Sequence, residues 1–211
     1  MRSDLPRVIA SIIIIAGSCL MMGVGFTLYE AFNTMMSRSH AEEMHFELEI
    51  SGGVESTAET EDALRKKLQE EGLAFAEVTK KDTFYQYGGG EGVATVLVIP
   101  EELCPDYMEL RDRNGSALSL PQGAGVLVTN RLSERYQILP GEPIAIYDDA
   151  VKPQGSTVDG VFQNYYGRYL LVSRQGYEEI FGEEAKANTF WVRTGDRDVD
   201  SVASQIAADF P

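Results

Sequence analysis

The stretch Val8–Tyr29, VIASIIIIAGSCLMMGVGFTLY, determines how the rest of the chain is organised. It contains no charged residue and no His, Asn, Gln or Pro. These 22 residues would form a helix about 33 Å long at about 1.5 Å per residue, and a bilayer core is about 30 Å thick. The sequence therefore predicts residues 1–40 as a cytoplasmic tip, a membrane-spanning helix over 8–29 and a helical stalk.

Three other kinds of segment share some of these features. A cleaved signal peptide has an apolar region of about 7–15 residues followed by small residues at the cut, and no such site follows Tyr29. A lipoprotein signal would place a cysteine after small residues, as in AGSC at 16–19, but the next residues, LMMGVGF, remain apolar. A buried core helix is the third alternative, and it is rarely free of charge over such a length.

One side of the predicted helix carries small residues. Ser11, Ser18 and Gly25 recur every seven residues, with Ala10 and Gly17 beside them. Lipid supplies no hydrophobic force between helices, so close packing at small residues is needed to hold membrane helices together. We predict that Ser11, Gly17, Ser18 and Gly25 form a helix-packing face. The alternative is that Gly and Ser are simply tolerated in membrane helices, since no GxxxG spacing occurs.

The charges are distributed unevenly along the chain. The net charge is −15 and the charged residues before position 41 sum to +1, so residues 41–211 carry −16. Such a domain lacks the basic footprint of a nucleic-acid-binding protein and would not lie flat on anionic lipid. Arg2 and Arg7 precede the apolar run, and four glutamates follow it between 42 and 49. The positive-inside tendency predicts a cytoplasmic N-terminus, with residues after about 35 outside the cell membrane.

Cysteine and histidine are scarce in this sequence. Cys19 lies in the apolar run and Cys104 is the only other cysteine, so the outer domain depends on its core and not on disulfides. The two histidines, His40 and His45, lie near the stalk, five residues apart and not on one helical face. We therefore expect no metal site, no cofactor and no Ser-His-Asp set, and we interpret the chain as non-catalytic.

Residues 41–211 are predicted to form one mixed α+β domain. Apolar residues alternate in His45–Ile50, which predicts a strand, and a capping box of Ser56 and Glu59 predicts a helix that ends before Gly72. Further strands are expected at 75–87, 93–99, 125–128, 144–147, 157–162, 169–172 and 188–193. Further helices are expected at 129–136, 176–181 and 199–209, and 100–106 is expected to be a connector.

Two motifs resemble ligand-binding loops but have simpler explanations. The glycine cluster at 88–92 lacks the Lys-Ser/Thr pair of a phosphate loop and leads into a β-rich run, which favours a hairpin turn. The aspartates of GDRDVDS at 195–201 alternate as in a calcium loop, but Ser201 and Ala207 stand where that loop needs Gly and Glu. Carboxylates are also favoured at a helix N-terminus by the helix dipole alone.

The segment GVFQNYYGRY at 160–169, followed by Ser173 and by YEEIFG at 177–182, resembles the FtsX-like (MacB-type) ABC transporter permeases of bacteria. In that family, G-x-x-E-N-Y-x-x-H-Y leads into S-x-x-x-Y-x-x-x-F-G within the extracytoplasmic domain. The similarity covers most of the chain, best over 95–194. Other similar pieces are LVIP at 97–100, LRDR at 110–113, VLVT at 126–129, PGE at 140–142 and the opening IAGSCLMMGVGF.

The resemblance implies a permease with a separate ABC-type ATP-binding subunit and further membrane helices. We therefore expect this chain to be an N-terminal piece that ends inside the outer domain. Its expected partners are membrane lipid, the ATP-binding subunit and other permease helices or a second permease copy, and not nucleic acid. Gln163 stands where the family commonly has Glu, and Arg168 where it has His, so no role of that acid or histidine is carried over.

The aromatic residues near position 165 are expected to divide between core and surface. Phe162 and Tyr169 should pack inward at the ends of two strands. The residues between them lie beside a glycine that permits a tight turn, and loop aromatics with a polar tip often serve recognition. The predicted recognition loop consists of Asn164, Tyr165, Tyr166, Gly167 and Arg168.

Three functions are compatible with these observations. The first is the permease subunit of an FtsX/MacB-like ABC transporter, which couples ATP hydrolysis by another subunit to export or to mechanical work outside the membrane. The second is a single-pass membrane-anchored sensor or binding ectodomain. The third is a membrane-anchored enzyme built on a carboxylate pair, which 33 acidic residues make easy to find by chance. The resemblance favours the first.

Overall fold

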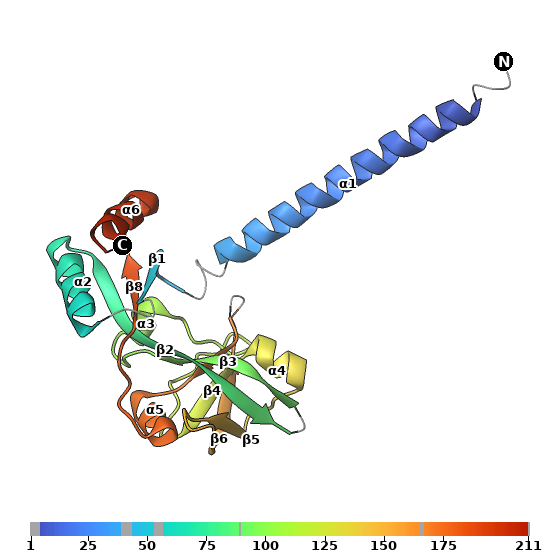
Figure 1. The fold of residues 1–211 in the computed structure, drawn as a ribbon. Helices are drawn as coiled ribbons and strands as arrows, with labels where there is room; N and C mark the ends of the chain where they lie inside the picture. Colours follow the sequence, from blue (N-terminus) through green and yellow to red (C-terminus); the bar gives the residue numbers. More distant parts are fainter. Residues whose placement is uncertain (1–4, 39–43, 53–56, 89, 165–166, 211) are drawn as a thin grey trace. The chain divides into compact units, whose positions relative to one another are not determined.

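The computed structural model describes residues 5–38, 44–52, 57–88, 90–164 and 167–210 (Figure 1). The chain divides into two compact units, residues 1–38 and 39–211. The first is a helix and the second a mixed α/β domain. The predicted fold class, an apolar N-terminal helix followed by an α+β domain, is therefore confirmed.

Unit 1–38 consists of helix α1, Leu5–Arg38. Pro6 lies in its first turn, where the missing N–H costs nothing. The segment Ile12–Asn33 is long and apolar enough to cross a membrane, by its length and composition. All described side chains of this segment are exposed, as expected for a helix that has no protein core around it. The predicted helix is thus found, and it continues through the predicted stalk to Arg38.

Unit 39–211 is built on an eight-stranded mixed sheet with the order β1-β8-β2-β3-β7-β4-β6-β5. An additional antiparallel pairing of β2 with β5, at Tyr85↔Ile146 and Gln86↔Ala145, closes six of these strands into a barrel. The pairs β3–β7 and β4–β6 are parallel. The strands are β1 Leu48–Ser51, β2 Ala74–Tyr87, β3 Gly90–Val98, β4 Gly125–Thr129, β5 Pro143–Tyr147, β6 Pro153–Phe162, β7 Tyr169–Leu171 and β8 Thr189–Arg193.

The long strand β2 links two parts of the domain (Figure 1). Its C-terminal half pairs with β3 and β5 in the barrel, and its N-terminal half pairs with β8, which in turn pairs with β1. Helices α2 (Ala58–Glu70) and α6 (Val199–Asp209) pack on this second part through Leu68 and Ile206. The remaining helices are α3 Cys104–Tyr107, α4 Asn130–Tyr136 and α5 Arg174–Phe181.

The apolar side chains gather in three clusters. One fills the barrel and includes Tyr85 and Ile146. A second lies outside it, between the barrel and the β1–β8 part, and includes Trp191 and Phe162. The third lies under α2 and α6. No cluster contains a disulfide, so this burial is what stabilises the domain, as the sequence predicted.

Local differences from the sequence prediction have simple causes. The helix α2 is capped by Thr57, whose side chain accepts a hydrogen bond from the N–H of Thr60, so the predicted capping box at Ser56 is wrong by one residue. The short helix α3 begins within the predicted connector 100–106 and ends just beyond it, at Tyr107, and the two prolines of this stretch hide it in the sequence. Strands β2 and β3 form the predicted hairpin, with Tyr87 paired to Gly90, and Gly90 and Gly92 belong to β3. Gly89 lies outside the described residues. Gly72 and Gly182 end helices with positive φ angles of 67° and 70°.

Candidate functional site

The loop between β6 and β7 contains the residues that the sequence singles out for recognition. Asn164 is only 1% exposed, and its Oδ1 accepts a hydrogen bond from the N–H of Gly167 at 2.9 Å. Its own N–H donates to Oδ1 of Asn130 in α4 at 3.2 Å. Asn164 therefore shapes the loop from inside.

Gln163 anchors the same loop through hydrogen bonds to Arg111 and Asn130. Its N–H donates to the carbonyl of Arg111 at 2.8 Å. Its Oε1 accepts from Nδ2 of Asn130 at 3.0 Å. Asn130 thus holds two consecutive loop residues at once. A neutral amide at position 163 thus anchors the loop.

The end of the loop is fixed by close packing. A Cβ on Gly167 would lie 2.2 Å from the ring of Tyr169, so only glycine fits there without movement of the ring. Arg168 is exposed, and its carbonyl accepts a hydrogen bond from the N–H of Thr95 at 2.9 Å. Phe162 and Tyr169 are buried, which confirms their prediction as core residues.

The other two predicted recognition residues, Tyr165 and Tyr166, lie outside the described residues. Of the five residues in the predicted loop, the structure describes three: Asn164 is buried, Gly167 is tightly packed and Arg168 is exposed. The recognition role of the loop stays a prediction.

A second feature was not apparent in the sequence: the segment 44–51, here called the entering segment, is attached to the core of the domain, with Met44 and Phe46 buried. Its Phe46 ring stacks on Trp191 in β8, with 4.6 Å between ring centroids. Oε2 of Glu49 accepts a hydrogen bond from Nε1 of Trp191 at 3.0 Å, and Oε2 of Glu47 accepts from the N–H of Thr194 at 2.9 Å. Trp191 in β8 and Thr194 just after that strand therefore hold positions 46, 47 and 49 of this segment.

The backbone of the entering segment is paired on its other side as well. The N–H of His45 donates to the carbonyl of Tyr107 at 3.0 Å, and Met44 forms a bridge with Met108. The segment that follows α1 in the sequence is therefore fixed between β8 and the α3 region. The alternating pattern at 45–50 predicts a strand, but no local signal identifies the partners of that strand.

The buried thiol of Cys104 borders a hollow of about 440 Å³ next to α3. Apolar side chains, among them Met108 and Leu118, form much of its lining, and Glu101 and Glu109 contribute carboxylates. Burial raises the pKa of Cys104 to about 11, and the charge of Glu101 adds to this effect. The thiol is therefore neutral at pH 7 and is not an activated nucleophile.

The described residues offer no evidence for a metal centre. In the part of the chain that the structure describes, no group of three or more His, Cys, Asp or Glu side chains could hold a metal ion. Asp198, in the calcium-like motif, is the N-cap of α6 and accepts a hydrogen bond from the N–H of Ser201. The helix-capping explanation of that motif therefore accounts for this aspartate.

Three residues of the predicted packing face of α1, Gly17, Ser18 and Gly25, have described surroundings, and the packing role itself stays a prediction. Gly17 and Ser18 line a shallow hollow on the helix together with Met21. A Cβ added to Gly25 would meet nothing within 4 Å, so a larger side chain there would project freely. The hydroxyl of Ser18 donates to the carbonyl of Ile14 at 2.9 Å and is thus satisfied within the helix. The side chain of Ser11 lies outside the described residues.

The domain, a barrel joined by one long strand to a smaller helix-covered sheet, is similar to domains of known structure. These are extracytoplasmic domains of ABC-type transporters and a permease domain, at low sequence identity. The MacB-type proteins named in the sequence analysis are among the proteins from which these structures come. No family model matches the sequence, and no curated protein sequence matches it.

Three solved structures illustrate the similarity. The periplasmic region of MacB from Actinobacillus actinomycetemcomitans has 11% identity and a TM-score of 0.45, over 76% of this chain and 79% of that one. The extracellular domain of the noncanonic ABC-type transporter YknZ from Gram-positive bacteria has 13% identity and a TM-score of 0.46, over 74% and 86%. A domain of a putative permease protein from Porphyromonas gingivalis has 15% identity and a TM-score of 0.39, over 76% of each chain.

Proposed function

We propose that this chain is part of the permease subunit of an FtsX/MacB-like ABC transporter. In this proposal α1 crosses the cell membrane with its N-terminus in the cytoplasm, and residues after about 35 lie outside. A separate ATP-binding subunit hydrolyses ATP, and the membrane helices carry the resulting motion to the outer domain. The work done there is export or a mechanical action on an extracytoplasmic partner.

The observation that carries this proposal is the attachment of the entering segment. A domain that is merely tethered to a membrane needs only a flexible linker, whose variable end-to-end distance couples motion poorly. Here the entering segment, which residues 39–43 separate from α1 in the sequence, is held by ring stacking at Phe46 and by hydrogen bonds at Glu47 and Glu49. Because protein interiors are densely packed, a displacement of this segment is passed to the core. The family-like segment at 160–182 supports the same assignment.

The ATP-binding subunit gives the most direct test. The full chain, carrying an affinity tag, is purified from its native membranes in a mild detergent and its partners are identified by mass spectrometry. We expect an ABC-type ATP-binding protein in the complex and ATP hydrolysis that is inhibited by vanadate. A chain recovered without any ATP-binding protein, under conditions where other membrane complexes of the same cells survive, would contradict the proposal and favour a membrane-anchored sensor.

A further inference from the structure

Two neighbouring hollows on the outer domain share part of their lining. The first, of about 440 Å³, is the hollow beside α3 that Cys104 borders. The second, of about 790 Å³, is lined by residues 99–102, by residues 119–123 and by the start of α5. Glu101, Ser119 and Leu120 line both hollows. The two hollows therefore adjoin along the segment 117–122, and together they are here called the α3–α5 groove.

The end of the groove beside α3 is mostly apolar. Met108, Leu110 and Leu118 contribute to its lining, and the first two of these are buried. The thiol of Cys104 adds a weakly polar surface to the same lining. Pockets that take up a ligand group are lined in this way, with an apolar floor and a few polar groups at the margin. This end of the groove therefore suits an aliphatic side chain.

The wall of the groove carries backbone groups that the domain itself does not use. Among the described residues, the N–H and C=O groups of Ser119 and Leu120 have no hydrogen-bond partner. Pairing of this segment with the preceding chain ends at Leu118, whose N–H donates to the carbonyl of Leu110 at 2.8 Å. Pro121 confines the backbone of Leu120 to the extended region. An extended segment with unpaired N–H and C=O groups is a template for pairing with another extended chain.

Negative charge lies where the two hollows adjoin. Glu101 and Glu102 are exposed, and in the part of the chain that the structure describes neither carboxylate has an ion pair or a hydrogen bond. The third glutamate of the groove, Glu109, is neutralised by its ion pair with Arg111. A positive side chain, that of Arg174, lies at the α5 end. The middle of the groove is therefore complementary to a cation, and its α5 end is not.

We propose that the α3–α5 groove binds an extended basic segment of another polypeptide. An aliphatic side chain of this segment enters the apolar end, and a Lys or Arg two residues away reaches Glu101 and Glu102. Side chains two positions apart lie on the same face of an extended chain, about 6.6 Å from each other. Backbone hydrogen bonds to the segment at Ser119 and Leu120 fix the direction of the bound chain.

Two other occupants fit these observations less well. A second copy of the domain would bring together two bodies that each carry a net charge of −16 over residues 41–211, and these repel each other. A small amphipathic amine would use the apolar end and the carboxylates, but it would leave the backbone groups of Ser119 and Leu120 unpaired. The groove belongs to the outer domain alone, so this inference does not depend on the proposed transporter function.

The probe that tests the proposal is the capped peptide acetyl-Thr-Ser-Leu-Thr-Lys-Thr-Ser-amide. Its binding to the full chain in an uncharged detergent is measured by isothermal titration calorimetry. We expect replacement of its Leu by Ser to raise the Kd about tenfold or more, because the apolar end then stays unfilled. Replacement of its Lys by Glu should weaken binding further than replacement by Ser, because a carboxylate is repelled by Glu101 and Glu102.

The backbone contribution is tested by methylation of the peptide amides, one nitrogen at a time. Backbone groups of successive residues point to opposite sides of an extended chain. Methylation should therefore weaken binding at residues on the side that faces the segment 117–122, and not at the residues between them. These changes leave the protein itself unaltered, so a loss of binding cannot come from unfolding.

The position of the peptide is tested by a change of charge in the protein. Glu101→Gln combined with Glu102→Gln should weaken binding of the Lys peptide by about 3- to 30-fold, which is the range for two exposed charge pairs. It should not affect the peptide in which Ser replaces Lys. The matched control is Glu91→Gln, an exposed residue near the start of β3, whereas the groove residue Ile99 follows the end of that strand. It should leave the Kd unchanged.

A peptide with photo-leucine in place of Leu maps the site, because its crosslinks are located by mass spectrometry. Crosslinks to Met108, Leu118 or Leu120 are expected. Crosslinks confined to other parts of the chain, equal binding of the Lys and Glu peptides, or absence of saturable binding would each overturn the proposal. Binding that is insensitive to methylation at every amide, and is matched by 4-phenylbutylamine, would also overturn it and would assign the groove to small amines.

Discussion

The Phe46 ring stacks on the indole of Trp191 with 4.6 Å between centroids and 14° between the ring planes. Phe46 belongs to the segment that follows α1, and Trp191 belongs to β8, close to the C-terminal helix. This contact joins two residues far apart in the sequence, so Phe46 belongs to the core of the domain and not to a linker.

Phe162 gives a direct test of where the core ends and the loop begins. Its side chain is 1% exposed within the cluster that contains Trp191. We expect Phe162→Ala to lower the free energy of unfolding by about 3–5 kcal/mol, because a large cavity replaces buried apolar surface. Chemical denaturation of the full chain in detergent, followed by Trp191 fluorescence, measures the change.

The control for this measurement is Phe84→Ala. Phe84 lies on β2 and is 61% exposed. Removal of its ring should change stability by less than about 0.5 kcal/mol. Equal losses for the two variants would show that burial in this structure does not describe the core correctly.

Much of this architecture follows from local sequence patterns. The apolar run predicts α1, alternation predicts most strands, and glycines such as Gly72 and Gly182 predict helix ends because they adopt positive φ. What cannot be predicted is which strands pair. The closure of the barrel depends on Tyr85 meeting Ile146, which are far apart in the sequence and carry no mutual signal.

For the candidate site too, the sequence predicts local features but not the contacts between distant residues. A loop at 163–168 with a glycine beside aromatic residues is visible in the sequence. Its anchoring by Asn130 and the position of Lys80 over the ring of Tyr169 are not, because each depends on the packing of separate strands. A single Asn or Lys in a sequence can have many structural roles, so only the fold shows which residues it contacts.

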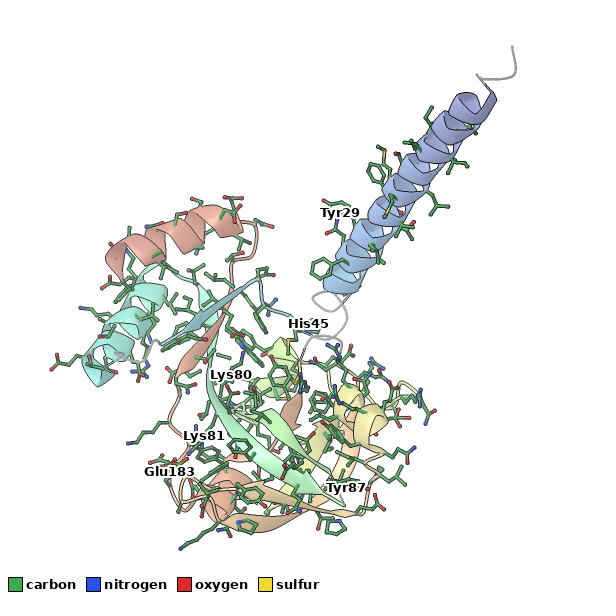
Figure 2. All side chains as sticks on the ribbon, turned by 45° about the vertical axis from the view of Figure 1, so that its right-hand side comes forward. Tyr29, His45, Lys80, Lys81, Tyr87 and Glu183 are labelled. Atoms are coloured by element: carbon green, nitrogen blue, oxygen red, sulfur yellow. The ribbon has the colours of Figure 1, made fainter. Side chains whose placement is uncertain are left out.

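The ion pairs of Lys81 predict that the stability of the fold depends on pH. Nζ of Lys81 in β2 contacts Glu183 at 2.9 Å and Asp149 at 2.8 Å (Figure 2 labels Lys81 and Glu183). The hydrogen bond from Lys81, together with its charge, lowers the pKa of Glu183 below the ordinary value of 4.5. The ionised form therefore favours the folded state, and this stabilisation is present above about pH 4.5 and is lost as the pH falls through the lowered value.

We expect Glu183→Gln to be less stable than the wild type at pH 7, and the difference in melting temperature to shrink as the pH falls below about 4.5. Thermal unfolding over pH 3–8 checks this. The control is Glu184→Gln, because among the described residues no ion pair is found for Glu184. A constant difference for Glu183→Gln at every pH would mean that the ion pair does not contribute through ionisation.

The orientation of the chain can be checked by thiol labelling in whole cells. Ser116 lies in an exposed turn of the domain, and Ser3 precedes the apolar helix. In the Cys19→Ser background we expect Ser116→Cys to react with a membrane-impermeant maleimide and Ser3→Cys to react only after the membrane is permeabilised. The reverse pattern would place the domain in the cytoplasm and would exclude the proposed topology.

The packing face of α1 can be tested with two glycines that lie close together. Gly25 belongs to the predicted face with Ser18, whereas Gly23 lies about 160° away from Gly25 around the helix, at about 100° per residue. A Cβ at either glycine meets nothing within 4 Å, so neither change should disturb α1 itself. Ile13 is a poorer control, because it lines the same hollow as Gly17 and Ser18.

We expect Gly25→Leu to reduce crosslinking of α1 to its neighbouring membrane helix in the intact complex, because the added volume prevents close approach of the helices. Gly23→Leu, the same change on the opposite side, should leave crosslinking near the wild-type level. Both variants place a leucine in lipid, so differences in membrane insertion cannot explain a selective loss. Equal losses, or a larger loss from Gly23→Leu, would show that the small residues of the predicted face do not form the contact.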